Sequence, residues 1–209
     1  MTTSSDAQPR TILFFGDSIT DAGRRDDPDQ LGNGYVRVIA ERLAESRPEL
    51  TVINRGIGGN RTGDLIARLD EDCIDLEPDV VSILIGINDV WRRYDDDDAT
   101  SAEQFEANLR TILTGIRDRS GAAIVIIEPF LLPVVDKLRF REDLDPKIEI
   151  LRRLADEFDA TFIALDAVLA GHAQQSSPEE VAGDGIHPTA DGHRIVADVW
   201  LAGAVSALG

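Results

Sequence analysis

Cysteine, lysine and long apolar runs are scarce in this sequence of 209 residues, and each scarcity excludes a class of protein. Cys73 is the only cysteine, so a scaffold held by internal disulfides is excluded, and we expect Cys73 to be a small buried apolar side chain. No apolar run approaches the roughly 20 residues of a membrane-spanning helix. Residues 1–10 lack the basic start and apolar stretch of a signal peptide, which predicts a flexible N-terminal tail and a cytoplasmic location.

Positive charge is also scarce. Lys+Arg is 21 against Asp+Glu 39, which gives a formal net charge of −18. A surface this negative repels nucleic-acid backbones and anionic lipid headgroups, so we expect neither nucleic acid nor a membrane as partner. Lys137 and Lys147 are the only lysines, and this acidic, arginine-rich composition raises the hypothesis of a high-salt habitat.

The length and the apolar fraction of 43% suit one globular domain with one core. Near-continuous apolar runs, typical of buried parallel strands, alternate with segments whose apolar residues recur at the three-to-four spacing of helices. The runs cover residues 11–15, 51–54, 79–85, 122–128 and 161–165, and the helical segments cover 34–44, 62–69, 102–119, 146–158 and 187–208. This alternation predicts an α/β fold, a three-layer α/β/α sandwich around a five-stranded parallel sheet. We take the flavodoxin-like strand order 2-1-3-4-5, in which the loops after the first three strands, with Ser18, Gly59 and Asn88, are neighbours.

A serine follows the first predicted strand, in the segment Gly16-Asp17-Ser18. A turn at a strand end can point the hydroxyl of Ser18 into a cleft, as a nucleophile requires. The alternative is that Asp17 or Ser18 only caps the next helix. Neither GxxxxGK[ST] nor GxSxG occurs in the chain, which excludes a phosphate-binding loop and the usual α/β-hydrolase arrangement.

The loops after the second and third predicted strands contain candidate oxyanion donors. Gly56, Gly58 and Gly59 let the backbone approach a ligand closely, and the amide of Gly59 is placed to bind an oxyanion, although a tight turn alone would also explain the glycines. Asn88 offers its side-chain NH2 as a second donor, whereas we expect Asp89 to order its loop.

A histidine lies three residues after a carboxylate before the last predicted helix. Asp184 can accept the Nδ1 proton of His187 and leave Nε2 to serve as general base. We assign structural roles to His172, in a polar loop, and to His193, inside the helical pattern.

Two further segments are interpreted as loops. Residues 95–98 are four consecutive aspartates, but they lack the spaced oxygens and glycine turn of a calcium site, so a solvated loop is expected. Pro129, Pro133 and the mixed charges of residues 136–145 predict a long loop over residues 130–145 that shapes the cleft or meets a neighbouring subunit.

These segments together resemble, in order and in text, the four blocks of the SGNH (GDSL-type) hydrolase family. The resemblance extends from about residue 11 to about residue 200. The serine, glycine, asparagine and histidine of the family fall on Ser18, Gly59, Asn88 and His187, and the aspartate of the triad falls on Asp184. The resemblance implies a single SGNH hydrolase domain over residues 11–209, an esterase that works through an acyl-enzyme without metal or organic cofactor.

The longer strings GDSITDAGR, LGNGYV, NRGIGGN, IGINDVWRRYD and DGIHPTADGH look most like the acetylxylan-esterase-type carbohydrate deacetylases. In those enzymes an aromatic pocket holds the small acyl group, and Tyr35 and Trp91 are the candidates for it here. The alternative for both is packing in the core or in a loop. Asp17 is a further substrate-binding candidate. Asn60 stands where many members carry aspartate and Arg61 follows it, which affects the expected substrate preference.

The resemblance thus implies that Ser18 attacks an ester carbonyl, while the amides of Ser18 and Gly59 and the side chain of Asn88 hold the oxyanion. The expected substrate is a short acetylated xylo-oligosaccharide, a small molecule. Two alternatives stay open: a lysophospholipase or thioesterase for longer acyl chains, and a non-catalytic carbohydrate-binding or scaffold protein. A homo-oligomer is compatible with the sequence, although no stripe of residues identifies an interface.

Overall fold

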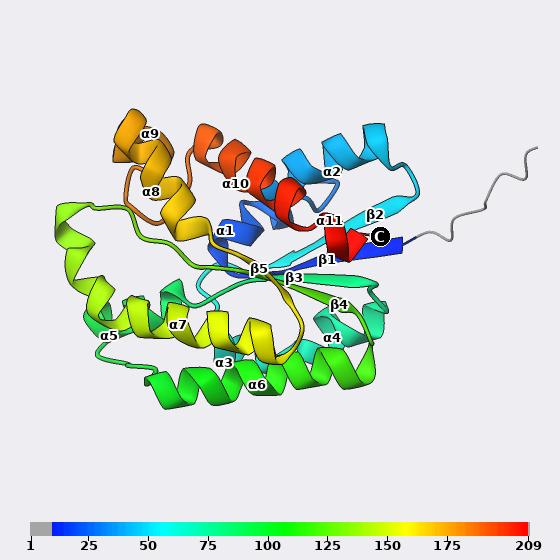
Figure 1. The fold of residues 1–209 in the computed structure, drawn as a ribbon, viewed down its shortest axis with the longest axis horizontal. Coiled ribbons are helices and arrows are strands. Elements are labelled where there is room, and N and C mark those ends of the chain that lie inside the picture. Colours follow the sequence, from blue (N-terminus) through cyan, green and yellow to red (C-terminus); the bar gives the residue numbers. More distant parts are fainter. Residues whose placement is uncertain (1–9, 209) are drawn as a thin grey trace, which may run out of the picture.

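In the computed structural model of the protein, residues 10–208 are described, and they form three layers with a parallel sheet in the middle (Figure 1). The sheet order is β2-β1-β3-β4-β5, which confirms the predicted fold. The strands are β1 (Arg10–Gly16), β2 (Leu50–Gly56), β3 (Val80–Leu84), β4 (Ala123–Ile127) and β5 (Thr161–Ile163). Residues 1–9 of the predicted tail lie outside the described residues, and Arg10 already belongs to β1.

Helices cover both faces of the sheet. On one face lie α1 (Ser18–Asp21), η1 (Arg24–Asp26), α2 (Tyr35–Ser46), α8 (Leu165–Gln175), α9 (Pro178–Val181), α10 (Ala190–Gly203) and α11 (Val205–Leu208). On the other lie α3 (Thr62–Ala67), α4 (Leu69–Asp72), η2 (Ile74–Leu76), α5 (Ile87–Asp95), α6 (Ala102–Arg119) and α7 (Arg141–Glu157). The short helix η3 (Val135–Phe140) precedes α7. No helix within residues 10–208 is long and apolar enough to cross a lipid bilayer.

Alternate side chains of the strands build two hydrophobic clusters, one on each face of the sheet. On β1, Ile12 and Phe14 belong to the cluster under α2 and α10, and Leu13 and Phe15 belong to the cluster under α6 and α7. Side chains of a strand point alternately to opposite faces, so a strand buried on both sides reads as a continuous apolar run. Cys73 is buried as expected, and burial raises the pKa of its thiol to about 12.

The predicted helix over residues 146–158 is longer than the pattern indicated. It is α7, which begins at Arg141, because the buried side chain of Leu144 extends its apolar face and Pro146, in the second turn, removes only one backbone N–H. The prediction of a loop over residues 130–145 was therefore wrong in part, because this segment contains η3 and the first turn of α7.

Other boundaries also differ from the sequence pattern. The segment 62–69 is divided between α3 and α4, and the segment 187–208 forms α10 and α11 only from Ala190 onward. The helices α5 and α8 were not predicted, so His172 lies on α8 instead of in a polar loop, and Asp95 is the last residue of α5. The remaining aspartates of the run 95–98 are exposed, as expected of a solvated loop.

Candidate active site

The carboxyl ends of β1 and β2 lie so close to the backbone of β3 and α1 that only glycine fits. A Cβ atom on Gly16 would lie 2.4 Å from the carbonyl oxygen of Leu84, and one on Gly56 would lie 2.1 Å from the backbone nitrogen of Asp21. Gly16 and Gly56 also pair in the register of the two strands. The missing side chains therefore let the loop after β2 lie directly beside the turn that carries Ser18.

Ser18, His187 and Asp184 form a continuous row of hydrogen-bonded side chains. Ser18 Oγ lies 3.0 Å from His187 Nε2, and His187 Nδ1 lies 2.8 Å from Asp184 Oδ2. The second oxygen of Asp184 accepts hydrogen bonds from the backbone N–H groups of Ile186 at 2.9 Å and His187 at 2.7 Å. The aspartate is thereby fixed in the position that orients the imidazole toward the serine.

The hydrogen bond between Asp184 and His187 shifts the pKa values of the two side chains in opposite directions. Partial burial favours the neutral form of Asp184, but the hydrogen bonds from His187 and from two backbone N–H groups outweigh it and hold the pKa of this carboxyl well below its usual range. The hydrogen bond to Asp184 in turn raises the pKa of His187. The carboxylate is thus ionised throughout the neutral range and stabilises a proton on the imidazole.

The predicted oxyanion donors lie in the segments that follow β1, β2 and β3. Gly59 has a φ of +83°, and its N–H and that of Ser18 have no acceptor within residues 10–208. Asn88, on the first turn of α5, donates one Nδ2 hydrogen to the backbone oxygen of Asn60 at 3.0 Å, and its other hydrogen remains for a ligand. The hydrogen bond to Asn60 ties α5 to the loop that carries Gly59.

Buried polar groups hold this loop in place. Asp89 is fully buried and accepts hydrogen bonds from the N–H of Thr62 at 3.1 Å and its hydroxyl at 2.6 Å, so it orders the loop as expected. Burial raises the pKa of Asp89 to about 6. Asn60 accepts from Arg68 Nε at 2.8 Å, and Arg61 pairs with Asp98 at 2.8 Å, at the edge of the site.

Asp17 is buried and not open to a substrate, contrary to its prediction as a substrate-binding residue. It is only 1% exposed, and its Oδ1 accepts a hydrogen bond from the N–H of Ile19 at 3.0 Å, which caps α1. Its Oδ2 is buried without a partner among the described residues, and burial raises the pKa of the carboxyl to about 7. The capping alternative is therefore the correct one for Asp17, and the capped helix orients Ser18.

Tyr35 was also wrongly predicted to line the acyl pocket. Its ring is fully buried edge-on against Phe14, with centroids 5.6 Å apart, and its hydroxyl lies 3.0 Å from Thr20 Oγ1. The backbone N–H of Tyr35 donates to Nδ1 of His193 at 3.1 Å, so His193 is structural as predicted, and burial lowers its pKa to about 4. An aromatic residue at the start of a helix gives the same sequence signal whether it faces the core or a cleft.

Trp91 remains the aromatic candidate, since it is half-buried and its ring centroid lies 6.1 Å from that of His187. The structure adds Lys137, which the sequence reasoning missed. Its Nζ lies 4.8 Å from the centroid of Trp91 and donates to the backbone oxygen of Asp184 at 2.6 Å. The one available signal was its rarity, because Lys137 is one of two lysines among 21 basic residues.

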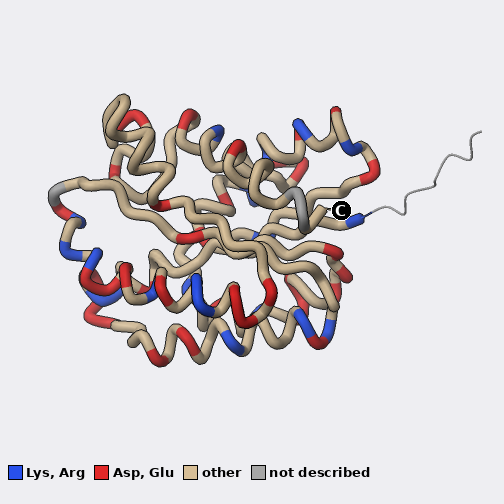
Figure 2. The backbone as a smooth tube through the Cα atoms, in the orientation of Figure 1, with Lys and Arg blue, Asp and Glu red and all other residues tan. Residues whose placement is uncertain are grey.

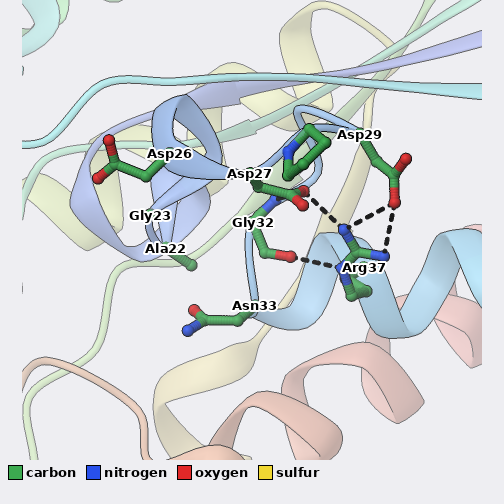
Figure 3. Close-up of a pocket in the computed structure, with 9 residues that line it drawn as sticks. Ala22, Gly23, Asp26, Asp27, Asp29, Gly32, Asn33 and Arg37 are labelled. Carbon is green, nitrogen blue, oxygen red and sulfur yellow. Dashed lines mark hydrogen bonds and ion pairs between the residues drawn. The ribbon is translucent and has the colours of Figure 1, made fainter.

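A polar pocket of about 660 Å³ lies between α1 and α2, away from the serine (Figure 3). None of its lining residues belongs to the row of Ser18, His187 and Asp184. The guanidinium of Arg37 donates to Asp27 at 2.6 Å, to Asp29 at 3.3 Å and to the backbone oxygen of Gly32 at 2.6 Å. These charges satisfy one another and stabilise the connection between the two helices.

Comparisons with known proteins agree with this arrangement. The model of the GDSL-like Lipase/Acylhydrolase family matches residues 14–195. An acetylxylan esterase of Geobacillus stearothermophilus is 35% identical over 201 residues, 91% of each chain.

Solved structures show the same fold. The crystal structure of Axe2, an acetylxylan esterase from Geobacillus stearothermophilus, has a TM-score of 0.87 at 33% identity over 95% of each chain. A putative GDSL-like lipase from Parabacteroides merdae has a TM-score of 0.89 at 30% identity, over 94% of this chain and 95% of its own. Catalytic mutants of Axe2 with alanine in place of a serine, an aspartate or a histidine are also similar.

Proposed function

The chain belongs to the GDSL-like lipase/acylhydrolase family and is a carboxylic ester hydrolase, and from that premise we propose that it removes O-acetyl groups from short acetylated carbohydrates of the xylo-oligosaccharide type. The observation that carries the proposal is the unbroken row from Ser18 Oγ through His187 to Asp184, with links of 3.0 and 2.8 Å. The similarity to an acetylxylan esterase supports acetyl as the acyl group.

In the proposed mechanism, Ser18 attacks the acetyl carbonyl while His187 takes its proton. Asp184 accepts the Nδ1–H of the imidazole, which leaves Nε2 as the acceptor facing Ser18 Oγ. The negative carboxylate also stabilises the imidazolium that forms. His187 then returns the proton to the sugar oxygen as it leaves, and an acetyl-enzyme remains.

Three donors stabilise the tetrahedral intermediate in this mechanism. They are the backbone N–H groups of Ser18 and Gly59, which have no acceptor among the described residues, and the free Nδ2 hydrogen of Asn88. Donors already in position act on the charge that develops in the transition state without reorganisation. Water, activated by His187, then attacks the acetyl-enzyme by the same route and releases acetate.

The surroundings of the serine favour a small acyl group. Among the side chains that the structure describes, those of residues 10–208 except 135, 205 and 206, Leu138 is the one large hydrophobic side chain that is exposed. A longer acyl chain would need apolar surface to bury each CH2 group, at about 0.8 kcal/mol each. Trp91, half-buried beside His187, offers one flat apolar wall, which is enough for a methyl group. This supports deacetylation over lysophospholipase or thioesterase activity on long chains.

The site also argues against a non-catalytic carbohydrate-binding or scaffold protein. Such a protein has no need for a serine aligned with a histidine and a low-pKa carboxylate. It likewise has no need for the backbone N–H groups of Ser18 and Gly59 to be without an acceptor among the described residues.

We propose further that the substrate is a small molecule and that neither nucleic acid nor a membrane is a partner. Acidic residues are spread over the helices of both outer layers, with basic residues interspersed (Figure 2). The excess of 39 acidic over 21 basic residues disfavours binding of a phosphate backbone. Cytoplasmic location and a homo-oligomeric state stay predictions, which cell fractionation and light scattering of the purified protein test.

The decisive experiment measures acetate released from acetylated xylo-oligosaccharides by the wild type, Ser18→Ala and the matched control Ser46→Ala, whose serine lies on the exposed end of α2. We expect release by the wild type and by the control but not by Ser18→Ala. A parallel assay compares 4-nitrophenyl acetate with 4-nitrophenyl octanoate. Faster turnover of the octanoate would show that the enzyme prefers esters of longer acyl chains. Turnover that does not depend on Ser18 would overturn the mechanism.

A further inference from the structure

Lys137 places a positive charge beside Asp184, the carboxylate that pairs with His187. Its Nζ donates to the backbone oxygen of Asp184 at 2.6 Å and lies 3.5 Å from Oδ2, the oxygen that accepts the hydrogen bond from His187. The lysine side chain is 16% exposed, so solvent screens this charge only in part. Lys137 therefore competes with the imidazole for the negative charge of Asp184.

Aromatic contacts hold Lys137 in this position. Phe140, the last residue of η3, stacks on Tyr94 of α5 with centroids 4.5 Å apart, and the hydroxyl of Tyr94 donates to the backbone oxygen of Arg139 at 3.0 Å. Trp91, one turn earlier on α5, lies 6.1 Å from Phe140 and beneath the ammonium of Lys137. The helix η3 is thus docked on α5, and this docking delivers the lysine to the loop that carries Asp184 and His187.

Four titratable groups face His187: Asp184, Asp17, Lys137 and His193. Asp184 lies on its own loop, Asp17 lies beneath Ser18 at the end of β1, and both carboxylates raise the pKa of the imidazole, whereas Lys137 lowers it. His193 on α10 is the fourth group, and burial lowers its pKa to about 4, so it is neutral near pH 7. Lys137 thus supplies the positive charge that opposes two carboxylates.

We propose that Lys137 is a positioning residue that keeps His187 in its neutral, proton-accepting form by placing an ammonium against Asp184 and holding Trp91 beside the imidazole. The inference rests on the proposed role of His187 as general base. An imidazole facing two carboxylates without an opposing cation is protonated over more of the neutral range and cannot take the proton of Ser18. Lys137 extends the working range of the enzyme to lower pH.

The proposal is tested directly by an NMR titration of the imidazole groups. The chain has three histidines, so the signal of His187 is assigned by its absence from His187→Gln. We expect Lys137→Met to raise the pKa of His187 by about 0.5–1 unit, because a neutral side chain no longer opposes the carboxylates. Lys137→Arg, which keeps the charge, is expected to leave it nearly unchanged. An unchanged His187 pKa in Lys137→Met would overturn the proposal.

A matched control removes a positive charge from the same short helix. Arg139→Gln alters a guanidinium that lies 4.7 Å from the ring centroid of Tyr94, away from the row, and we expect it to leave the pKa of His187 unchanged. An equal shift in Arg139→Gln would show that net charge, not the placement of Lys137, sets the pKa, and would contradict the proposal.

Kinetics supply a second readout. With 4-nitrophenyl acetate, the acid limb of kcat/KM in Lys137→Met is expected to move to higher pH by the same amount as the NMR titration shows. A role confined to loop structure would lower kcat at every pH without moving the limb, and that result would overturn the inference. The NMR shift does not require turnover, so a wild type without Ser18-dependent turnover would refute the proposed function alone.

Discussion

Ser18 Oγ and His187 Nε2 lie 3.0 Å apart although 169 positions separate them in the chain. Ser18 follows the carboxyl end of β1, which lies between β2 and β3, while His187 precedes α10, which packs across the same face of the sheet. Trp200 of α10 donates its Nε1–H to the buried Ser82 Oγ of β3 at 2.9 Å. The histidine therefore reaches the serine because α10 is anchored to the sheet.

Trp200→Phe tests this anchor. The substitution keeps an apolar ring but leaves the buried hydroxyl of Ser82 without its donor, and we expect the free energy of unfolding to fall by about 1–3 kcal/mol. Urea denaturation measures it. Adding Ser82→Ala removes the unsatisfied group and is expected to restore part of the loss. An unchanged unfolding midpoint in Trp200→Phe would show that the hydrogen bond contributes nothing.

Asn88→Ala tests the oxyanion donors. The substitution removes the free Nδ2 hydrogen and the tie to Asn60, and we expect kcat for acetyl ester hydrolysis to fall by about 10²- to 10³-fold, roughly 2.7–4 kcal/mol. KM is expected to change little, because the donor acts on the transition state. Asn33→Ala, in the polar pocket of Figure 3, serves as the control. Wild-type turnover in Asn88→Ala would remove this side chain from the mechanism.

Asp17→Asn tests the buried carboxyl beneath Ser18. Burial raises the pKa of Asp17 from 3.8 to about 7, so the folded protein holds this proton more tightly than the unfolded chain does. The resulting stabilisation is complete below about pH 3.8, declines as pH rises and is lost above about pH 7. Asparagine does not titrate and retains an oxygen for the N–H of Ile19.

We therefore expect Asp17→Asn to be more stable relative to the wild type at pH 8 than at pH 4, by an amount on the order of a few kcal/mol. Urea denaturation of both proteins at the two pH values checks this. The same variant removes a negative charge that faces His187, so the pKa of His187 is expected to fall. A stability difference independent of pH would contradict the raised pKa.

Lys147→Met tests the second lysine. Lys147 is completely buried on α7, with its Nζ 2.7 Å from Asp143 Oδ1 and 5.8 Å from the ring centroid of Phe105. Removal of the ammonium leaves a largely buried carboxylate unpaired, and we expect a loss of about 3 kcal/mol in the free energy of unfolding. Chemical denaturation measures it, and Asp143→Asn in the same chain is expected to recover part of the loss. If the single variant is as stable as the wild type, the pair is not a stabilising feature.

Local patterns were sufficient to predict the fold. Parallel strands buried on both faces leave continuous apolar runs, so the strands and the layers followed from the sequence, and the structure has the flavodoxin-like order 2-1-3-4-5 that we took as the premise. The same logic placed Ser18, Gly59 and Asn88 at one edge of the sheet. Boundaries that depend on packing, such as the start of α7 at Arg141, did not follow from the spacing.

The sequence by itself determined which strands form and which chemistry-bearing residues follow them, because strands buried on both faces leave continuous apolar runs. Only the tertiary structure decided that Asp17 and Tyr35 face the interior while Lys137 faces the row of Ser18, His187 and Asp184. The identity of a residue does not by itself show whether its side chain is buried or exposed. Its surroundings are set by elements distant in the chain, such as η3 docked on α5, whose contacts no local pattern encodes.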